Sequence, residues 1–241
     1  MKQYLILTFI FFLSCQDRQS KIVSSNNLAD TIQPIAEIKS QDDKPQLEEF
    51  FIDSLNIGRK SFNKIELSKY RTADSNYVVI KFFSKKSEKW NLRNEFHFEK
   101  DGVTECDPKM GDFNNDGLND IICVSNVAAR GANEIRRLFI YDKRNDNLVY
   151  INNSDNYPNM LYNKELNCID AFLIYAGSST VFLKINGDSL REFASVELFD
   201  GLTITTYDRE GKGKIIYQNT TSKTDYIRYK NFNPLQEYDD Y

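Results

Sequence analysis

The sequence predicts an all-β domain over residues 49–241, built as an antiparallel sandwich or a partial β-propeller. Two observations support this prediction. From Phe50 onward, short runs of β-branched and aromatic residues alternate with Asn, Asp, Gly and Lys. Dipeptides typical of hairpin turns also lie between such runs. They are Asp101-Gly102, Asn186-Gly187, Asp200-Gly201 and Glu210-Gly211.

The runs of strand-forming residues are short and closely spaced, as expected in an antiparallel sheet. The predicted strands cover residues 64–70, 77–83, 95–99, 121–125, 138–142, 148–151, 180–185, 193–199, 203–207, 214–218 and 225–229. Residues 163–175 fit either a short helix or a buried strand, because their periodicity does not distinguish the two. The sequence contains no convincing repeat with a fixed period.

The N-terminus has the features of an export signal. Lys2 precedes an apolar run at residues 4–13, which is too short to span a bilayer as a helix and predicts a signal peptide over residues 1–14. The run ends in Phe12-Leu13-Ser14-Cys15, which resembles the lipobox of bacterial lipoproteins with Phe in place of the usual Leu. The resemblance implies that Cys15 is acylated. A secretory signal with a chance cysteine is the alternative.

The residues after Cys15 predict a tether and a location. Residues 15–48 are polar, poor in aromatics and without sustained periodicity, so we expect a flexible connection between the lipid and the domain. Gln16 rather than Asp follows the cysteine. By analogy with other bacterial lipoproteins, this implies an outer-membrane lipoprotein that faces the periplasm or the cell surface.

The charge of the chain argues against a nucleic-acid partner. Removing residues 1–14 takes away Lys2 and leaves 30 Lys and Arg against 35 Asp and Glu, a net charge of −5. Binding to phosphates needs a basic surface instead. One basic cluster alternates with apolar residues, which predicts the solvated face of a strand and turn. Its members are Arg130, Arg136, Arg137, Lys143 and Arg144.

Most arrangements of residues that mark catalytic sites are missing from the sequence, so we predict that the protein is not an enzyme. The single histidine, His97, lies in an alternating run that indicates an exposed strand position. No second histidine is present for a metal triad or a serine triad, and no nucleophile-elbow, zinc-protease or P-loop motif occurs. Cys106, Cys123 and Cys168 allow one disulfide in an exported protein but do not define it.

Residues 111–124, GDFNNDGLNDIICV, predict a calcium loop that leads into a strand. Asn, Asp and Gly are poor helix formers, so the aspartates spaced four apart belong to a loop. Calcium prefers six to eight oxygen ligands from such a flexible segment. Cys123 stands where an EF-hand needs its bidentate Glu, which excludes an EF-hand, and a metal-free turn is the alternative. The predicted ligands are Asp112, Asn114, Asp116, the Leu118 carbonyl and Asp120.

The DxNxDGxND pattern followed by an apolar strand resembles the calcium loops of FG-GAP and VCBS repeats. From residue 112 to residue 197 the order of elements is also similar to that of exported lipoproteins that act as immunity proteins. Those proteins bind and block peptidoglycan hydrolases, and they tend to have Phe where this loop has Asn115. The resemblance implies a calcium-stabilised β domain that inhibits a cell-wall hydrolase or a similar toxin.

The binding loop that we predict is residues 126–133, NVAARGAN, with Arg130 and Asn133 as candidate contacts. An arginine there could form a paired hydrogen bond with a catalytic carboxylate. An ordinary strand connection is the alternative for this segment. Two other functions stay open: a surface module that binds glycans or proteins, and a glycosidase whose paired carboxylates are recognisable only from geometry.

Overall fold

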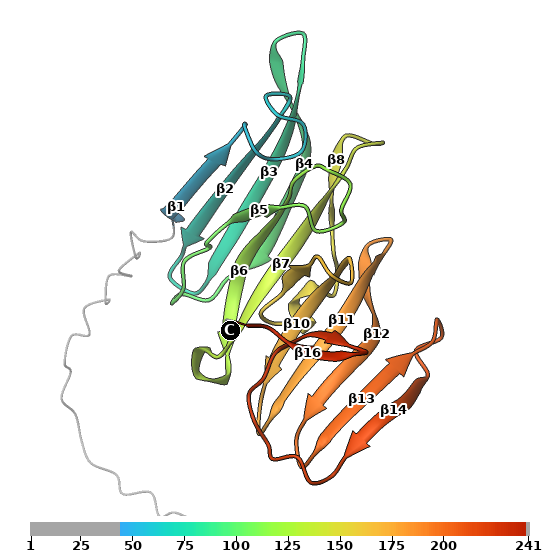
Figure 1. Ribbon diagram of the computed structural model, residues 1–241. Helices are drawn as coiled ribbons and strands as arrows, with labels where there is room; N and C mark the ends of the chain where they lie inside the picture. Colours follow the sequence, from blue (N-terminus) through green and yellow to red (C-terminus); the bar gives the residue numbers. More distant parts are fainter. Residues whose placement is uncertain (1–43, 240–241) are drawn as a thin grey trace, which may run out of the picture. The chain divides into compact units, whose positions relative to one another are not determined.

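The computed structural model describes residues 44–239, in which sixteen β-strands and no α-helix are found (Figure 1). Two short 3-10 turns, Ala129–Gly131 and Ser154–Asn156, interrupt the strands. No helix within residues 44–239 is long and apolar enough to cross a membrane. The all-β, antiparallel prediction is confirmed. The predicted signal peptide, Cys15 and most of the tether lie outside the described residues.

The first sheet is a four-stranded antiparallel meander in the order β1-β2-β3-β4. Its strands are β1 (Gln46–Asp53), β2 (Asn63–Arg71), β3 (Asn76–Lys86) and β4 (Lys89–Glu99). Side chains alternate between the two faces of a strand, and Ile65, Leu67, Val78, Ile80 and Phe82 are buried on one face. β1 begins inside residues 15–48, for which the sequence predicts a tether and no strand, so this boundary of the prediction is wrong.

The second sheet is a meander in the order β5-β6-β7-β8 and packs with both of its faces. Its strands are β5 (Lys109–Gly111), β6 (Asp120–Ala128), β7 (Asn133–Asp142) and β8 (Asn147–Tyr150). Phe139 and Tyr141 belong to the core shared with the first sheet, whereas Leu138 and Ile140 belong to the core shared with the third. Because neighbours in a strand point to opposite sides, near-continuous apolar runs in β6 and β7 supply both cores.

The third sheet has six strands in the order β14-β13-β12-β11-β10-β9. They are β9 (Leu161–Asn163), β10 (Cys168–Ile174), β11 (Ser178–Asn186), β12 (Ser189–Leu198), β13 (Leu202–Tyr207) and β14 (Gly213–Asn219). The ambiguous residues 163–175 therefore form a strand rather than a helix. Three of the predicted hairpin turns are confirmed, because residues 186–187, 200–201 and 210–211 connect successive strands of this sheet.

A C-terminal hairpin covers the face of the third sheet that the second sheet leaves open. It consists of β15 (Tyr229–Phe232) and β16 (Leu235–Glu237). Tyr229 and Phe232 pack with Phe182, Val196 and Ile204 of the third sheet. The strand predicted at residues 225–229 is therefore wrong in position, since β15 begins where that prediction ends.

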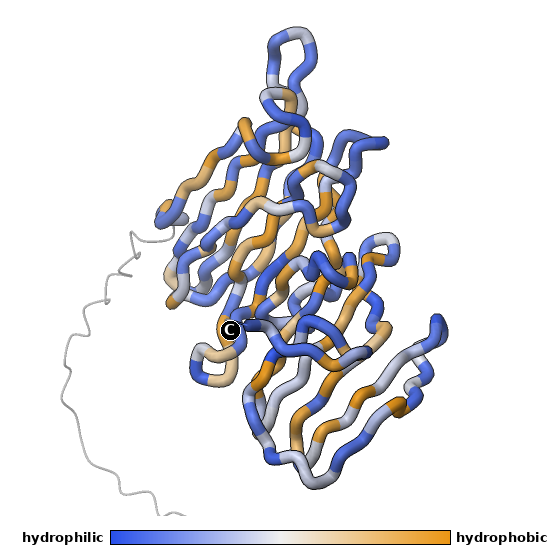
Figure 2. The backbone as a smooth tube through the Cα atoms, in the orientation of Figure 1, coloured by the Kyte–Doolittle hydropathy of each residue, from blue (hydrophilic) through white to orange (hydrophobic). Residues whose placement is uncertain are grey.

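Hydropathy along the backbone follows the strand alternation that predicted the fold (Figure 2). Two local predictions were wrong. Asp101-Gly102 does not form a hairpin, because it lies between β4 and β5, which belong to different sheets. Arg136 is not on a solvated face: it is 4% exposed and pairs with Asp107 and Glu134. The charge of Arg136 is thus compensated inside the domain.

Candidate functional site

The predicted calcium loop connects β5 to β6. Gly111 pairs with Asp120 across these antiparallel strands, so residues 112–119 form the loop of a hairpin. The segment contains no helix, in line with its Asn, Asp and Gly content. Gly117 has a φ of 84° and Asn115 a φ of 59°. Glycine adopts this left-handed backbone readily and asparagine tolerates it, which lets the chain turn sharply twice within a few residues.

Side-chain oxygens of the loop hold its backbone in a curve. Asp112 accepts hydrogen bonds from the backbone N–H of Asp116 at 3.0 Å and of Gly117 at 2.8 Å. Asn114 Oδ1 accepts a second bond from Asp116 at 3.0 Å, and Asp116 Oδ1 accepts from Leu118 at 2.9 Å. Three predicted ligands therefore take part in local bonds that wrap the chain around Asp112.

Asp120 has a different environment, because it is fully buried at the first position of β6. Its carboxylate accepts hydrogen bonds from Phe113 N and from Tyr141 N, each at 2.8 Å. Burial raises the pKa of Asp120 to about 7, and the charges of Asp116 and Asp112 add to this rise against the two hydrogen bonds. The negative charges of Asp112 and Asp116 thus add to the effect of burial in disfavouring the ionised form of Asp120.

The donor set fits calcium in chemistry and order. Three carboxylates, one amide oxygen and the Leu118 carbonyl are hard oxygen ligands, and a carboxylate oxygen that accepts an N–H still has a lone pair to offer. None of the three carboxylates forms an ion pair with a Lys or Arg of residues 44–239. The same residues contain no ready-made cluster of three or more His, Cys, Asp or Glu side chains. Calcium therefore stays a prediction.

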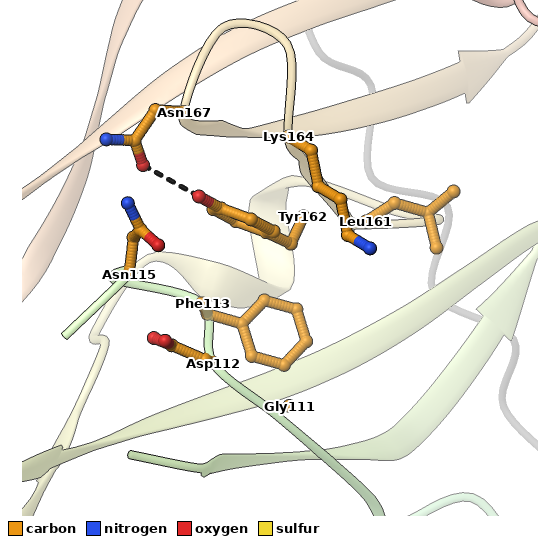
Figure 3. A pocket seen from close by; sticks show the side chains of 8 residues that line it. All are labelled: Gly111, Asp112, Phe113, Asn115, Leu161, Tyr162, Lys164 and Asn167. Atoms are coloured by element: carbon orange, nitrogen blue, oxygen red, sulfur yellow. Dashed lines mark hydrogen bonds between the residues drawn. The ribbon is translucent and has the colours of Figure 1, made fainter. Parts of the chain in front are cut away.

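A pocket of about 560 Å³ lies beside the loop (Figure 3). The loop contributes Asp112, Phe113 and Asn115, and the segment at β9 faces it across the pocket. Tyr162 donates its hydroxyl proton to Asn167 Oδ1 at 2.8 Å. The remaining lining residues are Gly111, Leu161 and Lys164. The sequence did not indicate this pocket, because its two sides are about fifty residues apart and meet through sheet packing.

The second predicted site, the loop between β6 and β7, has an unusual backbone. Ala129 and Arg130 have φ values of 50° and 57°, and Gly131 has a φ of 94°. Each non-glycine residue in this region costs about 1–2 kcal/mol. Residues 128–132 are exposed, and no hydrogen bond or ion pair connects the Arg130 side chain to another described residue. The loop therefore presents a free guanidinium on a strained turn.

The predicted binding loop, residues 126–133, was too long, because residues 126–128 belong to β6 and Asn133 begins β7. We define the loop as residues 129–132, and two asparagines fix its base. Asn133 donates to the Ile174 carbonyl at 2.8 Å and accepts from Ile174 N at 2.9 Å. Asn159 donates to the Ala132 and Phe172 carbonyls, each at 2.9 Å. The side chain of Asn133 is thus engaged within the domain. Asn159 was missed in the sequence, because its partners are 27 and 13 residues away.

The other residues singled out in the sequence have structural surroundings. Cys106, Cys123 and Cys168 are free thiols buried in the cores, so no disulfide forms among them. Burial raises the pKa of Cys123 and of Cys168 to about 12, which makes both thiols poor nucleophiles. His97 is exposed on the first sheet, as predicted, and lies 2.7 Å from Glu95.

Comparisons of this chain with protein families, curated proteins and solved structures gave a similarity to solved structures alone. No family model and no curated protein matches the chain. Among solved structures, the chain is similar to a Xanthomonas protein described as related to a type IV secretion system, with 11% sequence identity and a TM-score of 0.45. The match covers 71% of this chain and 96% of that one. The function proposed below therefore rests on the residues of this chain.

Proposed function

We propose that the protein is an exported lipoprotein whose β domain inhibits a cell-wall hydrolase, or a similar toxin, by inserting residues 129–132 into its substrate cleft. The observation that carries this proposal is the exposed turn with three consecutive positive φ angles and Arg130 at its centre. Backbone strain of this kind persists where the surrounding structure holds it, and it concentrates at functional sites.

The hydrogen bonds at the base of the loop support inhibition by a pre-shaped segment. Asn133 and Asn159 connect the loop to residues 172–174 of β10, so the turn is attached to two sheets. A loop that is ordered before binding loses less entropy on association. The free Arg130 guanidinium matches a carboxylate in a cleft, because two parallel N–H···O bonds give both strength and orientation.

The remaining features fit the same function. Acylation of Cys15 would keep the domain at the membrane, and the stretch from Gln16 to the start of β1 would let it reach the wall. The net charge of −5 after cleavage would steer the domain toward a basic hydrolase at low ionic strength, which affects association rates more than affinity. Calcium held by Asp112, Asn114, Asp116, Leu118 and Asp120 would act as a structural cross-link of the β5–β6 hairpin.

The test is an inhibition assay with the hydrolase encoded nearest the gene. Lysis of purified peptidoglycan is followed with the mature wild-type chain, with Arg130→Ala and with Arg144→Ala. Arg144 is an exposed arginine on the β7–β8 turn and serves as the matched control. We expect full inhibition by wild type and Arg144→Ala and a loss of inhibition in Arg130→Ala. Undiminished lysis in the presence of excess wild-type protein, without a complex, would reject the proposal.

A glycan-binding module is the second candidate, and the outer face of the first sheet favours it. Tyr70 and Tyr77 stack there with ring centroids 5.3 Å apart, beside a hollow of about 620 Å³ that Glu66, Lys81 and Glu95 also line. Aromatic faces with nearby polar groups suit sugars. Binding of isolated wall polysaccharide that is lost in Tyr77→Ala, together with undiminished hydrolase activity, would favour this alternative.

A further inference from the structure

The last strand of the third sheet, β14, is exposed along almost its whole length. It forms the outer edge of the sheet and pairs with β13 on one side alone (Figure 1). Ile215, Ile216 and Tyr217 are 56%, 43% and 49% exposed, and they lie in the middle of a strand whose other residues are Gly, Lys, Gln and Asn. An apolar edge strand with open backbone groups is a template for another strand.

A bulge in β14 directs two of these side chains into one hollow. Ile204 pairs with Tyr217 and Thr205 pairs with Ile215, so Ile216 is an extra residue on β14. Bulges of this kind re-aim side chains, and here both Ile216 and Tyr217 line a hollow of about 430 Å³. Its other walls come from β13 and from the C-terminal hairpin. They are Leu202, Ile204, Phe232, Asn233 and Leu235.

The charge around this edge is opposite to that of the chain. Residues 208–225 contain four Lys and Arg and three acids, a net charge of +1, whereas the whole chain has a net charge of −4. Lys214 lies near the start of β14 and Lys212 just before it. Both are exposed, and neither forms an ion pair with an acid in residues 44–239. The edge is therefore complementary to an acidic segment.

We propose that the β14 edge and the adjoining hollow are a docking site for an extended, acidic and apolar segment of a partner protein. The segment adds a strand beside β14, and its main chain bonds to the open edge. One large apolar side chain enters the hollow between Tyr217 and Leu235. Acidic residues of the segment lie opposite Lys212 and Lys214. This site uses other residues than the loop at Arg130 and does not depend on the inhibitory function.

The direct test is binding of a synthetic peptide to the mature full-length chain, measured by fluorescence anisotropy. The probe is fluorescein-labelled Glu-Asp-Val-Thr-Leu-Val-Thr. Three altered peptides test the three proposed interactions separately. Replacing the central Leu by Ser tests the apolar contact in the hollow, and replacing both acids by Lys tests the charge interaction. N-methylation of alternate amides tests the main-chain hydrogen bonds. We expect each alteration to weaken binding, and we expect higher salt to weaken the binding of the acidic peptide because the charges are exposed.

Two neighbouring substitutions on β14 provide the matched control. Ile216→Glu places a charge in the hollow and should weaken peptide binding about 10- to 100-fold, the range for losing one buried apolar side chain. Ile215→Glu places the same charge on the adjacent residue, which does not line the hollow. It should change binding less than about threefold, as expected for a charge that stays in solvent. Leu235→Glu tests the same hollow from the hairpin if Ile216→Glu does not fold.

Several outcomes would overturn the proposal. Equal losses in Ile216→Glu and Ile215→Glu would mean that the hollow has no specific role. Binding of dodecanoate without binding of any peptide would identify the hollow as an acyl-chain site instead. A concentration-dependent dimer in sedimentation experiments that Ile216→Glu dissociates, with no peptide binding, would assign the edge to a second copy of the chain.

Discussion

Arg228 and Asp170 form an ion pair in which both side chains are fully buried. Arg228 Nε donates to Asp170 Oδ1 at 2.8 Å, and Nη2 donates to the same carboxylate and to the Asp170 carbonyl. The second carboxylate oxygen accepts from Asn163 at 3.0 Å and from the Tyr238 hydroxyl at 2.5 Å. The pair therefore connects the C-terminal segment to β10 through a saturated carboxylate.

Removing one partner of this pair should destabilise the domain strongly. Asp170→Ala leaves the Arg228 charge buried without its carboxylate, and such a change costs about 3–5 kcal/mol. We expect a loss of this size in urea unfolding, together with faster proteolysis after β14, because the hairpin loses a buried ionic attachment to β10. Replacing both partners, as in Asp170→Leu with Arg228→Met, should recover part of the stability. A loss below about 1 kcal/mol in Asp170→Ala would contradict this account.

Acid should weaken the contact between the first two sheets through Asp146. This carboxylate accepts from Asn63 at 3.0 Å and from Tyr141 at 2.8 Å, and it pairs with Arg59 at 2.7 Å. Partial burial opposes its ionisation, but hydrogen bonds led by those of Ser84 and Asn63 outweigh burial and lower its pKa from 3.8 to about 2. The native state thus favours the ionised form of this carboxyl group more than the unfolded chain does.

The sign of the pH effect follows from that lowered pKa. The contribution of Asp146 is complete above about pH 4 and disappears as the pH falls toward 2, with a maximum of about 2 kcal/mol. Asp146→Asn keeps the side-chain shape but does not titrate, so its free energy of unfolding should fall less steeply over this interval. Urea unfolding at several pH values measures the difference. Parallel curves for wild type and Asp146→Asn would show that this carboxylate is not coupled to folding.

Local chemistry made several elements predictable from sequence. The loop at residues 112–119 follows from the turn preferences of Asn, Asp and Gly, and the strands β6 and β7 follow from their apolar, β-branched runs. The sequence did not show that Phe139 faces the first sheet while Leu138 faces the third. Both residues are apolar, and which sheet covers each face depends on packing between segments that are distant in the chain.

Polar residues that act through distant partners were not predictable. Arg136 alternates with apolar residues and looked solvated, but its partner Asp107 comes from a loop 29 residues earlier. β1 was missed because Glu48 and Glu49 resemble the polar tether, whereas in the fold they pair with Lys69. Asn133 looked like a contact residue, and only the fold shows its bonds to Ile174. In each case the interaction joins residues that are distant in the sequence, so the local sequence pattern does not show it.

Calcium should stabilise the domain through the β5–β6 loop. Extracellular calcium modules bind at about 10⁻⁴ to 10⁻³ M, and each tenfold excess over Kd adds about 1.4 kcal/mol. Chelation should therefore lower the Tm of wild type, and Asp116→Ala should remove most of the calcium response. Asp74→Ala, an exposed aspartate in the β2–β3 turn, is the control. An identical calcium response in Asp116→Ala and wild type would mean that residues 112–119 are a metal-free turn.

Acylation at Cys15 should determine whether the protein is in the outer-membrane fraction or in the soluble periplasmic fraction. Several acyl chains, each contributing about 0.8 kcal/mol per buried CH₂, give a stable anchor. Wild type should therefore fractionate with the outer membrane, and Cys15→Ser should be released as a soluble periplasmic species. Fractionation and mass spectrometry of the N-terminal peptide measure both. An unmodified Cys15 in a soluble wild-type protein would mean that the segment is an ordinary secretory signal.

The strained loop provides the sharpest prediction about inhibition. Asn133 carries the hydrogen bonds that attach the end of the loop to Ile174, and Asn133→Ala leaves Arg130 in place but removes that support. If inhibition depends on a pre-shaped turn, Asn133→Ala should weaken it about tenfold, since ordering each freed side chain or loop residue on binding costs about 0.5–1.5 kcal/mol. The inhibition constant of the hydrolase measures this loss.

A substitution at Gly131 distinguishes the effect of the loop's backbone shape on inhibition from the effect of its attachment to Ile174. Its φ of 94° is unfavourable for any residue with a Cβ, yet a Cβ at this position would meet no atom within 4 Å. Gly131→Ala should therefore weaken inhibition through backbone strain alone, with little effect on the packed cores. If both Gly131→Ala and Asn133→Ala inhibit like wild type while Arg130→Ala does not, the arginine acts from a flexible loop, and the strained backbone has no part in binding.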